Sequence, residues 1–468
     1  MLNKMLRWSL FTATDIQQRR DQFVKRCLGT PCRVRPEWLA CKDMQKFIIQ
    51  GQKPLGGEIA VRGAKNEVLK LLPAAVLIPG PVTLTNVPWI AGVDVMSELI
   101  TELGGKVEQD RDKHQLVVDA SGITKTEMPD ELVTKERATS VFASSMLARF
   151  GEVTLHHPGG DVIGQRPLDL LLDGLETLGA KVVQGDREYR ISASKLKGAR
   201  FIFKRVSWTV TDALILAATL AEGTTELINA AMEPEVVALI EFLNAHGAKI
   251  TGAGSPVIKI QGVDSLRAID QPTRVIPDRL EAATFVCAAA ATNGNVVIKD
   301  CVPGHMEVFL KYMSEIGVPI ERGVDSLTVK QHKELKAVEL ITHEYPGFST
   351  DYQSTTTVLL TQAKGLSLVH ETIFEGRLFY TDKLKQMGAD ITMADPHRVL
   401  INGPSQLRGR KIVSPDLRAG MALVIAGLIA EGETTIGNIY QITRGYEDID
   451  ERLRSLGADI KMVETDYF

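Results

Sequence analysis

The chain has 468 residues, too many for one ordinary hydrophobic core, so two or three domains are expected. Its 44% hydrophobic and 24% charged residues are typical of a soluble globular protein, and its net charge of -4 argues against general nucleic-acid binding. The longest apolar runs, such as residues 421–430, are too short to span a membrane.

The first 43 residues differ in composition from the rest of the chain. They hold nine Lys and Arg against four Asp and Glu, and three of the five cysteines, Cys27, Cys32 and Cys41. No apolar segment with a small-residue cleavage site is visible, so a secretory signal is not expected, and the cysteine spacing matches no zinc motif. A basic organelle-targeting extension is one interpretation. We prefer to treat residues 1–43 as an extension that is disordered or not native, with Met44 as the natural start.

The remaining chain repeats one unit six times. A helix end, a glycine and the start of a strand recur with spacings of 75, 68, 70, 71 and 69 residues, at Gly104, Gly179, Gly247, Gly317, Gly388 and Gly457. A second series has spacings of 71, 72, 71, 71 and 67 residues, at Gly80, Gly151, Gly223, Gly294, Gly365 and Gly432. Glycine suits the C-terminal cap of a helix, and a period near 70 is too long for a solenoid repeat. The pattern predicts an α/β protein with two domains of three units each, and a ligand site in the cleft between them.

Function is expected where polar residues break the repeat, and the first such place is a loop. Residues 158–167 contain three glycines and two prolines, which excludes a regular helix or strand. They bracket Asp161, a candidate proton donor, and Arg166, a candidate anion-binding group. Taken alone, the loop also fits an ordinary surface turn with two solvated charges.

Three further groups lie where a loop meets a helix. Lys65 and Asn66 follow a strand and a glycine, so an ammonium and a helix N-terminus can bind an anion there, unless Lys65 is simply solvated. Arg137 lies in the first turn of a helix, the wrong end for the helix dipole, and is therefore either exposed or paired with an anion. Asp351 begins another helix, where helix capping is the alternative role.

The last two junctions lie near the C-terminus. Asp416 and Arg418 precede an apolar helix, and Arg444 precedes a glycine and a charged helix, with surface ion pairs as the alternative for each. If the junctions face one cleft, they can bind an anionic substrate that carries phosphate and carboxylate, with an acid and a base at hand. The cations are Lys65, Arg137, Arg166, Arg418 and Arg444, and the acids are Asp161 and Asp351.

The order of these motifs resembles the family of UDP-N-acetylglucosamine enolpyruvyl transferases. The resemblance extends from about residue 44 to the C-terminus, and the sister enolpyruvylshikimate-phosphate synthases share the fold but have different junction motifs. The matching segments are Gly63-Ala64-Lys65-Asn66, residues 158–167, Asn229-Ala230-Ala231, Glu233-Pro234-Glu235, Pro277-Asp278-Arg279, Thr350-Asp351, Phe374-Glu375, Asp416-Leu417-Arg418-Ala419 and Arg444-Gly445-Tyr446-Glu447.

The resemblance implies a fold and a reaction. The fold is a two-domain inside-out α/β barrel of six βαβαββ-type units, with residues 44–64 plus 278–468 in one domain and residues 65–277 in the other. The reaction transfers the enolpyruvyl group of phosphoenolpyruvate to the 3′-hydroxyl of UDP-N-acetylglucosamine and releases phosphate, the first committed step of peptidoglycan synthesis. It needs an acid, a base and cations, and no metal or organic cofactor.

The resemblance also assigns roles to individual residues. Asp161 takes the place of the family's loop acid, which is usually Cys, and Asn66 and Asp351 match residues that hold and deprotonate the sugar hydroxyl. Lys65, Arg166 and Arg444 match the family's phosphoenolpyruvate-binding cations. Arg137 matches a Lys/Arg-lined part of the substrate site, and Asp416 and Arg418 match the loop near the closed lid. A subset of the family carries Asp in place of the Cys. We therefore expect activity together with fosfomycin resistance, since the thiol that the epoxide alkylates is missing.

The nucleotide side departs further from the family pattern. Residues 205–212 replace a segment that is usually Lys-Val-Ser-Val-Gly-like, although Arg205 and Ser207 are still expected to meet a diphosphate. Trp208 is bulky, with simple packing as the alternative role, and Leu171 stands where many relatives have His. These two residues leave one alternative open, an enolpyruvyl transferase with another acceptor. A non-catalytic paralogue that binds a nucleotide sugar and regulates is a further alternative, against which the presence of Lys65, Asp161, Arg166, Asp351 and Arg444 argues. A cytoplasmic location is expected, with Cys287 and Cys301 as reduced, buried thiols.

Overall fold

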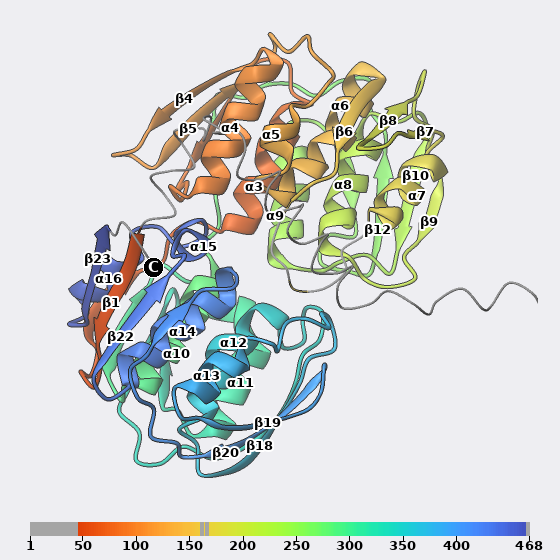
Figure 1. Ribbon diagram of the computed structural model, residues 1–468. Coiled ribbons are helices and arrows are strands. Elements are labelled where there is room, and N and C mark those ends of the chain that lie inside the picture. Colours follow the sequence, from red (N-terminus) through yellow and green to blue (C-terminus); the bar gives the residue numbers. More distant parts are fainter. Residues whose placement is uncertain (1–44, 160–162, 164–167, 465–468) are drawn as a thin grey trace, which may run out of the picture. The chain divides into compact units, whose positions relative to one another are not determined.

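The computed structural model describes residues 45–159, 163 and 168–464 of the chain (Figure 1). Two predictions concern segments that fall outside this range. The first is the extension formed by residues 1–43, and the second is the pair of charged loop residues Asp161 and Arg166.

Six small sheets build the described chain, as the repeat predicts. The first three units lie between residues 65 and 274. One consists of α3 (Lys65–Ala75), β3 (Pro81–Thr85), α4 (Ala91–Leu103), β4 (Lys106–Asp110), β5 (Gln115–Asp119) and the distant β13 (Thr273–Arg274). The next consists of α5 (Asp130–Val133), η1 (Arg137–Val141), α6 (Phe142–Phe150), β6 (Glu152–His156), α7 (Asp169–Thr177), β7 (Lys181–Gln184) and β8 (Glu188–Ser192). The third consists of β9 (Arg200–Ile202), α8 (Trp208–Thr219), β10 (Thr224–Ile228), α9 (Pro234–Ala245), β11 (Lys249–Thr251) and β12 (Val257–Gln261).

The other three units combine the start of the described chain with its second half. One consists of β2 (Gly56–Ala60), α10 (Arg279–Ala291), β14 (Asn295–Lys299), η2 (Pro303–Met306), α11 (Glu307–Ile316), β15 (Ile320–Arg322) and β16 (Ser326–Val329). The next consists of β17 (Glu339–Ile341), α12 (Thr350–Leu360), β18 (Gly365–His370), α13 (Thr381–Gln386), β19 (Asp390–Asp395) and β20 (Arg398–Gly403). The last consists of β21 (Lys411–Val413), α14 (Leu417–Ile429), β22 (Glu433–Gly437), α15 (Tyr440–Thr443), α16 (Ile449–Ser455), β23 (Asp459–Glu464) and β1 (Gln45–Gln50).

Five sheets share one topology, which confirms the βαβαββ-type unit. In the order β11-β12-β10-β9, for example, the edge strand β9 pairs parallel with β10, and β12 pairs antiparallel with both β10 and β11. The exception is the sheet β6-β8-β7, which has three strands. There the parallel edge strand is reduced to a single bridge between Glu127 and Thr154. The prediction of about four strands is therefore correct for five units and one strand too many for this one.

The glycine markers end helices for the expected reason. All six glycines of the first series have positive φ values, from 91° at Gly179 to 110° at Gly104, a region that glycine enters without steric cost. In the second series Gly294 is the exception, because Asn293 takes the left-handed conformation in its place with φ 50°. A side chain at Gly294 would collide with the Leu55 carbonyl oxygen, since a Cβ there would lie 2.2 Å from it. The glycine is therefore needed for close backbone approach.

Buried helices organise two hydrophobic clusters. One cluster draws its residues from 64 to 275 and contains α3, α6 and α8, and the other draws from 47 to 61 and 280 to 460 and contains α10, α12 and α14. Helix α14 is buried from Leu417 to Leu428 and apolar on all sides, as expected for a helix surrounded by protein (Figure 1). We interpret the clusters as the cores of two domains, and this division stays a prediction.

No helix in the described part of the chain combines the length and apolar character needed to cross a membrane.

Candidate active site

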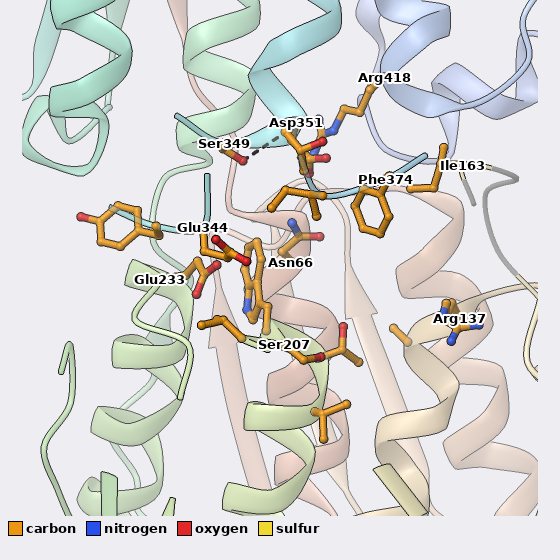
Figure 2. Close-up of a pocket in the computed structure, with 18 of the residues that line it drawn as sticks. Asn66, Arg137, Ile163, Ser207, Glu233, Glu344, Ser349, Asp351, Phe374 and Arg418 are labelled. Carbon is orange, nitrogen blue, oxygen red and sulfur yellow. Dashed lines mark hydrogen bonds and ion pairs between the residues drawn. The ribbon is translucent and has the colours of Figure 1, made fainter. Parts of the chain in front are cut away.

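Junction residues from both halves of the described chain line one pocket of about 460 Å³. In Figure 2, Asp351 and Arg418 lie on one side of the pocket and Ser207 on the opposite side, with Asn66 between them. Eight of the eleven predicted site residues line it: Lys65, Asn66, Arg137, Arg205, Ser207, Asp351, Arg418 and Arg444. Asp161 and Arg166 lie outside the described residues. Residues far apart in the chain thus converge, which sequence alone does not show.

Asp351 lies between two guanidinium groups near the start of α12. Its Oδ1 accepts a hydrogen bond from Arg377 Nη2 at 2.5 Å, and its Oδ2 accepts one from Arg418 Nη2 at 3.3 Å. Burial would raise the pKa of this carboxyl, but Arg418 and Arg377 outweigh burial and hold the pKa well below its usual range. The capping alternative for Asp351 is wrong, because the side chain of Ser349 caps α12 by accepting from the Asp351 backbone N–H. Asp351 is therefore ionised and directed into the pocket.

A second carboxylate, that of Glu136, joins two predicted anion-binding cations. Its Oε2 lies 3.2 Å from Arg444 Nη2 and 4.0 Å from Lys65 Nζ. Lys65 is 8% exposed and Arg444 is 6% exposed, so the solvated-lysine alternative for Lys65 and the surface alternative for Arg444 are wrong. Burial would raise the pKa of Glu136, yet Lys65 and Arg444 together lower it to about 2. Glu136 also begins the segment that we predicted as a helix with Arg137 in its first turn, and this segment starts as the 3-10 helix η1.

Asp416, one of the predicted substrate-binding residues, lies at the start of α14. It is the N-cap of α14, where its Oδ1 accepts from the backbone N–H groups of Arg418 at 2.9 Å and Ala419 at 3.0 Å, and it does not line the pocket. This cap directs the following Arg418 into the pocket, where its Nη1 donates to Tyr446 Oη at 2.9 Å. Arg418 is 4% exposed, so the surface-pair alternative is wrong for it as well.

Trp208, the first residue of α8, forms another part of the pocket wall. Its ring lies 5.8 Å from Lys70 Nζ and 5.6 Å from Arg279 Cζ, which is cation–π geometry on both counts. Its buried indole nitrogen has no hydrogen-bond partner among the described residues. Trp208 therefore lines the pocket as well as packing, and Leu171 lines it too from a buried position in α7.

Acidic groups near Trp208 behave differently from Asp351 and Glu136: Glu233 lines the pocket, whereas Asp212 is fully buried beside Lys70 and does not line it. Lys70 Nζ lies 3.7 Å from Asp212 Oδ2, but burial dominates and raises the pKa of Asp212 to about 8, with further contributions from Glu233 and Glu235. Burial also raises the pKa of Glu233 to about 7, against the effect of Arg279. Both carboxyl groups are at least partly protonated near neutral pH.

Sequence reasoning missed several residues that line the pocket. Arg377 resembles any surface arginine in the sequence, and only the folded chain brings it to Asp351, which lies 26 residues away. Lys70 carried a weak indication, because it is a charge within the otherwise apolar second half of α3. Glu233 and Arg279 belong to segments that match the family, but the sequence assigned them no role. Both line the pocket, and Arg279 Nε donates to Glu235 Oε1 at 3.0 Å.

The described residues contain no group of three or more His, Cys, Asp or Glu side chains placed to hold a metal ion. Cys287 and Cys301 are free and buried, and burial raises the pKa of each thiol to about 11.

Comparisons with known proteins agree with this geometry. The family model described as EPSP synthase (3-phosphoshikimate 1-carboxyvinyltransferase) matches residues 49–453. The UDP-N-acetylglucosamine 1-carboxyvinyltransferase of Halothermothrix orenii is 44% identical over 421 residues, which is 90% of this chain and 100% of the relative. UDP-N-acetylglucosamine 1-carboxyvinyltransferase 3 of Caldanaerobacter subterraneus subsp. tengcongensis is 43% identical over 417 residues, which is 89% of this chain and 99% of the relative.

Solved structures show the same fold at lower sequence identity. The crystal structure of the enolpyruvyl transferase NikO from Streptomyces tendae has a TM-score of 0.82 at 24% identity, with 90% of this chain and 99% of that one covered. The EPSP synthase of Acinetobacter baumannii has a TM-score of 0.68 at 20% identity, with 90% of this chain and 100% of that one covered.

Six repeated α/β units around a cation-rich pocket define the protein as an enolpyruvyl (1-carboxyvinyl) transferase in fold. The chain belongs to the EPSP synthase family, and within it to the UDP-N-acetylglucosamine 1-carboxyvinyltransferases.

Proposed function

We propose that this protein transfers the enolpyruvyl group of phosphoenolpyruvate to the 3′-hydroxyl of UDP-N-acetylglucosamine and releases phosphate, a step of peptidoglycan synthesis. The observation that supports this most strongly is the identity of 44% over the full length of a UDP-N-acetylglucosamine 1-carboxyvinyltransferase. The pocket adds support, because it combines buried cations with an ionised carboxylate.

The proposed chemistry is addition followed by elimination. The acceptor hydroxyl adds to C2 of phosphoenolpyruvate while C3 takes a proton, which forms a tetrahedral ketal. Loss of phosphate from C2 and of a proton from C3 then restores the double bond. The steps require a proton donor, a proton acceptor and cations that stabilise the phosphate and carboxylate groups.

For phosphoenolpyruvate, we propose Lys65 and Arg444 as cations that hold the two anionic groups. They lie within 4.0 Å of the same carboxylate oxygen, so they can contact one small anion together. Arg166 is proposed as a third cation on grounds of sequence alone. Arg137, Arg205 and Ser207 are proposed for the acceptor, whose diphosphate needs donors and positive charge.

For proton transfer, we propose Asp351 as the acceptor from the sugar hydroxyl, Asn66 as the group that orients this hydroxyl, and Asp161 as the acid that protonates C3. Asp351 is ionised, which is the state that accepts a proton, but its two arginines reduce its basicity. We therefore expect the acceptor hydroxyl to replace the longer contact, that with Arg418 at 3.3 Å, before transfer.

The decisive experiment measures phosphate release by the full chain from phosphoenolpyruvate, with and without UDP-N-acetylglucosamine. Release that depends on this acceptor, with an Asp161→Asn variant inactive, supports both the activity and the acid role. A folded parent that releases no phosphate would contradict the proposed function.

A second candidate is transfer to a different acceptor, and Trp208 favours it. Its ring occupies the pocket wall next to Ser207, where the nucleotide is expected. The same assay with other nucleotide sugars tests this alternative, since a preferred substitute acceptor would show a lower KM than UDP-N-acetylglucosamine.

Resistance to fosfomycin is a further part of the proposal. The loop carries Asp161 and no cysteine, so the epoxide has no thiol to alkylate there. We expect the intact mass of the protein to stay unchanged after incubation with fosfomycin and phosphate release to continue. A covalent adduct at Asp161 would contradict this.

We also propose a cytoplasmic location. Two buried, unpaired thiols, Cys287 and Cys301, fit a reducing compartment.

A further inference from the structure

The carboxylate of Glu136 bridges two of the cations that we propose for phosphoenolpyruvate. Its Oε2 atom lies 3.2 Å from Arg444 Nη2 and 4.0 Å from Lys65 Nζ, so one carboxylate oxygen contacts the two cations proposed for phosphoenolpyruvate. The three residues come from separate places in the chain, with Glu136 and Arg444 308 residues apart. The contact is therefore a product of the fold and not of neighbouring sequence.

The chain holds this carboxylate in place from several sides. Glu136 is 6% exposed, and its Oε1 accepts from the Ala138 backbone N–H at 3.4 Å, which caps η1. Its Oε2 also packs against the first turn of α4, where a Cβ on Gly92 would lie only 3.2 Å away. A glycine at this position leaves room for the carboxylate, and the N-terminal end of a helix favours negative charge.

The charges of the cluster compete with those of a substrate. Lys65 and Arg444 together carry two positive charges, and the ionised Glu136 cancels one of them. Phosphoenolpyruvate brings a phosphate and a carboxylate to the same cations. At such short distances between buried side chains, charges interact more strongly than in an exposed pair.

We propose that Glu136 is a positioning residue and a built-in competitor of phosphoenolpyruvate: it holds Lys65 and Arg444 in place before the substrate anion binds and releases them when it does. This inference rests on the proposed function for the identity of the anion. It predicts that the resident carboxylate reduces the affinity of the free protein for anions.

The test compares anion binding by the full-length protein and by Glu136→Gln. Glutamine keeps the shape and the oxygen that caps η1 but removes the charge. Isothermal titration calorimetry with inorganic phosphate and with phosphoenolpyruvate, without acceptor, is expected to give a Kd about tenfold lower for the variant, which equals about 1.4 kcal/mol. KM for phosphoenolpyruvate should fall in the same direction as the Kd, since both report the same competition.

Three further variants separate competition from other effects. Glu136→Asp keeps the charge and should stay close to the parent. Glu344→Gln removes an exposed charge from the wall of the same pocket and should change the Kd by about twofold at most, since exposed charges are screened. Gly92→Ala places a methyl group 3.2 Å from Oε2 and 3.3 Å from Leu69 Cδ1. It should tighten phosphate binding by displacing the carboxylate, so it tests the idea even if Glu136→Gln does not fold.

The outcomes are distinct. Tighter anion binding by Glu136→Gln and Gly92→Ala, with Glu136→Asp and Glu344→Gln near the parent, supports the inference. An unchanged or higher Kd in Glu136→Gln overturns the inference and leaves Glu136 a structural residue. If Glu136→Gln does not fold, an unchanged or higher Kd in Gly92→Ala overturns it instead. A parent that binds phosphate but releases none with UDP-N-acetylglucosamine would contradict the proposed function alone, because the calorimetric shift does not depend on turnover.

Discussion

Two groups of acidic side chains in and beside the pocket have opposite pKa shifts. The pKa values of Asp351 and Glu136, which contact cations of the proposed reacting groups, lie below their usual range. Near Trp208, the pKa of the fully buried Asp212 is raised to about 8 and that of the pocket-lining Glu233 to about 7. All four carboxyl groups are largely buried, so burial alone does not explain the difference.

The number and distance of neighbouring cations explain it. Asp351 has guanidinium nitrogens at 2.5 and 3.3 Å, one for each oxygen. Asp212 has one ammonium at 3.7 Å, and the nearby carboxyl groups of Glu233 and Glu235 act in the opposite direction. The attraction of a single cation at that distance does not offset the desolvation free energy of a buried carboxylate, whereas the attraction of two close cations does.

The two groups can therefore have different roles. Asp351 and Glu136 are fixed charges of the kind that proton transfer and anion binding need. Near Trp208 the acidic groups are at least partly protonated, which lowers the negative charge next to Arg205 and Ser207, the residues proposed for the diphosphate of the acceptor. Each of the following predictions changes one carboxyl group and tests the state or the role assigned to it.

The largest effect is expected for Asp351→Asn. Loss of a base that accepts the proton of the hydroxyl should lower kcat by about 10²–10⁴-fold, with a smaller change in KM for phosphoenolpyruvate. Phosphate release under saturating substrates measures it. Asp395→Asn is the matched control, because Asp395 also accepts from an arginine, Arg398 at 2.9 Å, yet does not line the pocket. A variant at position 351 that retains more than about a tenth of the activity would exclude Asp351 as the base.

Asp212→Asn should change how the stability of the protein depends on pH. The native pKa of Asp212 is about 8 and its ordinary value is 3.8, so the native state binds the proton more tightly than the unfolded state. The stability that this proton contributes is complete below about pH 4 and is lost as pH rises through 8.

Urea unfolding at pH 5 and pH 8 measures this prediction. Relative to Asp212→Asn, the parent should lose about 2–4 kcal/mol of unfolding free energy between these two values. Glu226→Gln is a suitable control, since Glu226 forms an exposed pair with Arg200. Parallel pH profiles for the parent and Asp212→Asn would show that Asp212 is ionised after all, as a conventional ion pair with Lys70.

The fold and the contrast between the two groups of acidic side chains could be only partly predicted from the sequence. The repeating glycines predict the six units because helix caps and strand starts are local events, and the junction cations could be selected because they interrupt that repeat. The sheet with three strands was not predicted, since one bridge at Glu127 leaves no trace in the residue pattern.

Pairings within the site depend on contacts that no local pattern contains. Asp212 and Lys70 lie on different helices, α8 and α3, and Glu136 meets Arg444 across 308 residues. In the sequence, Glu136 looks like an ordinary first residue of a helix. Its role follows only from which cations the fold brings to it.

The smallest effect is expected for the stability of Glu136→Gln, and its pH dependence should be the reverse of that for Asp212. The native pKa of Glu136 is about 2 against an ordinary value of 4.5, so the ionised form stabilises the native state. This contribution is present above pH 4.5 and is lost as pH falls through 2. We expect the variant to be about 1–3 kcal/mol less stable than the parent at pH 7, with the gap closing toward pH 3. Urea unfolding at the two pH values measures it, with Glu136→Asp as the variant that keeps the charge. A gap that is the same at both pH values would mean that the shape of the side chain, and not its charge, holds Lys65 and Arg444 together.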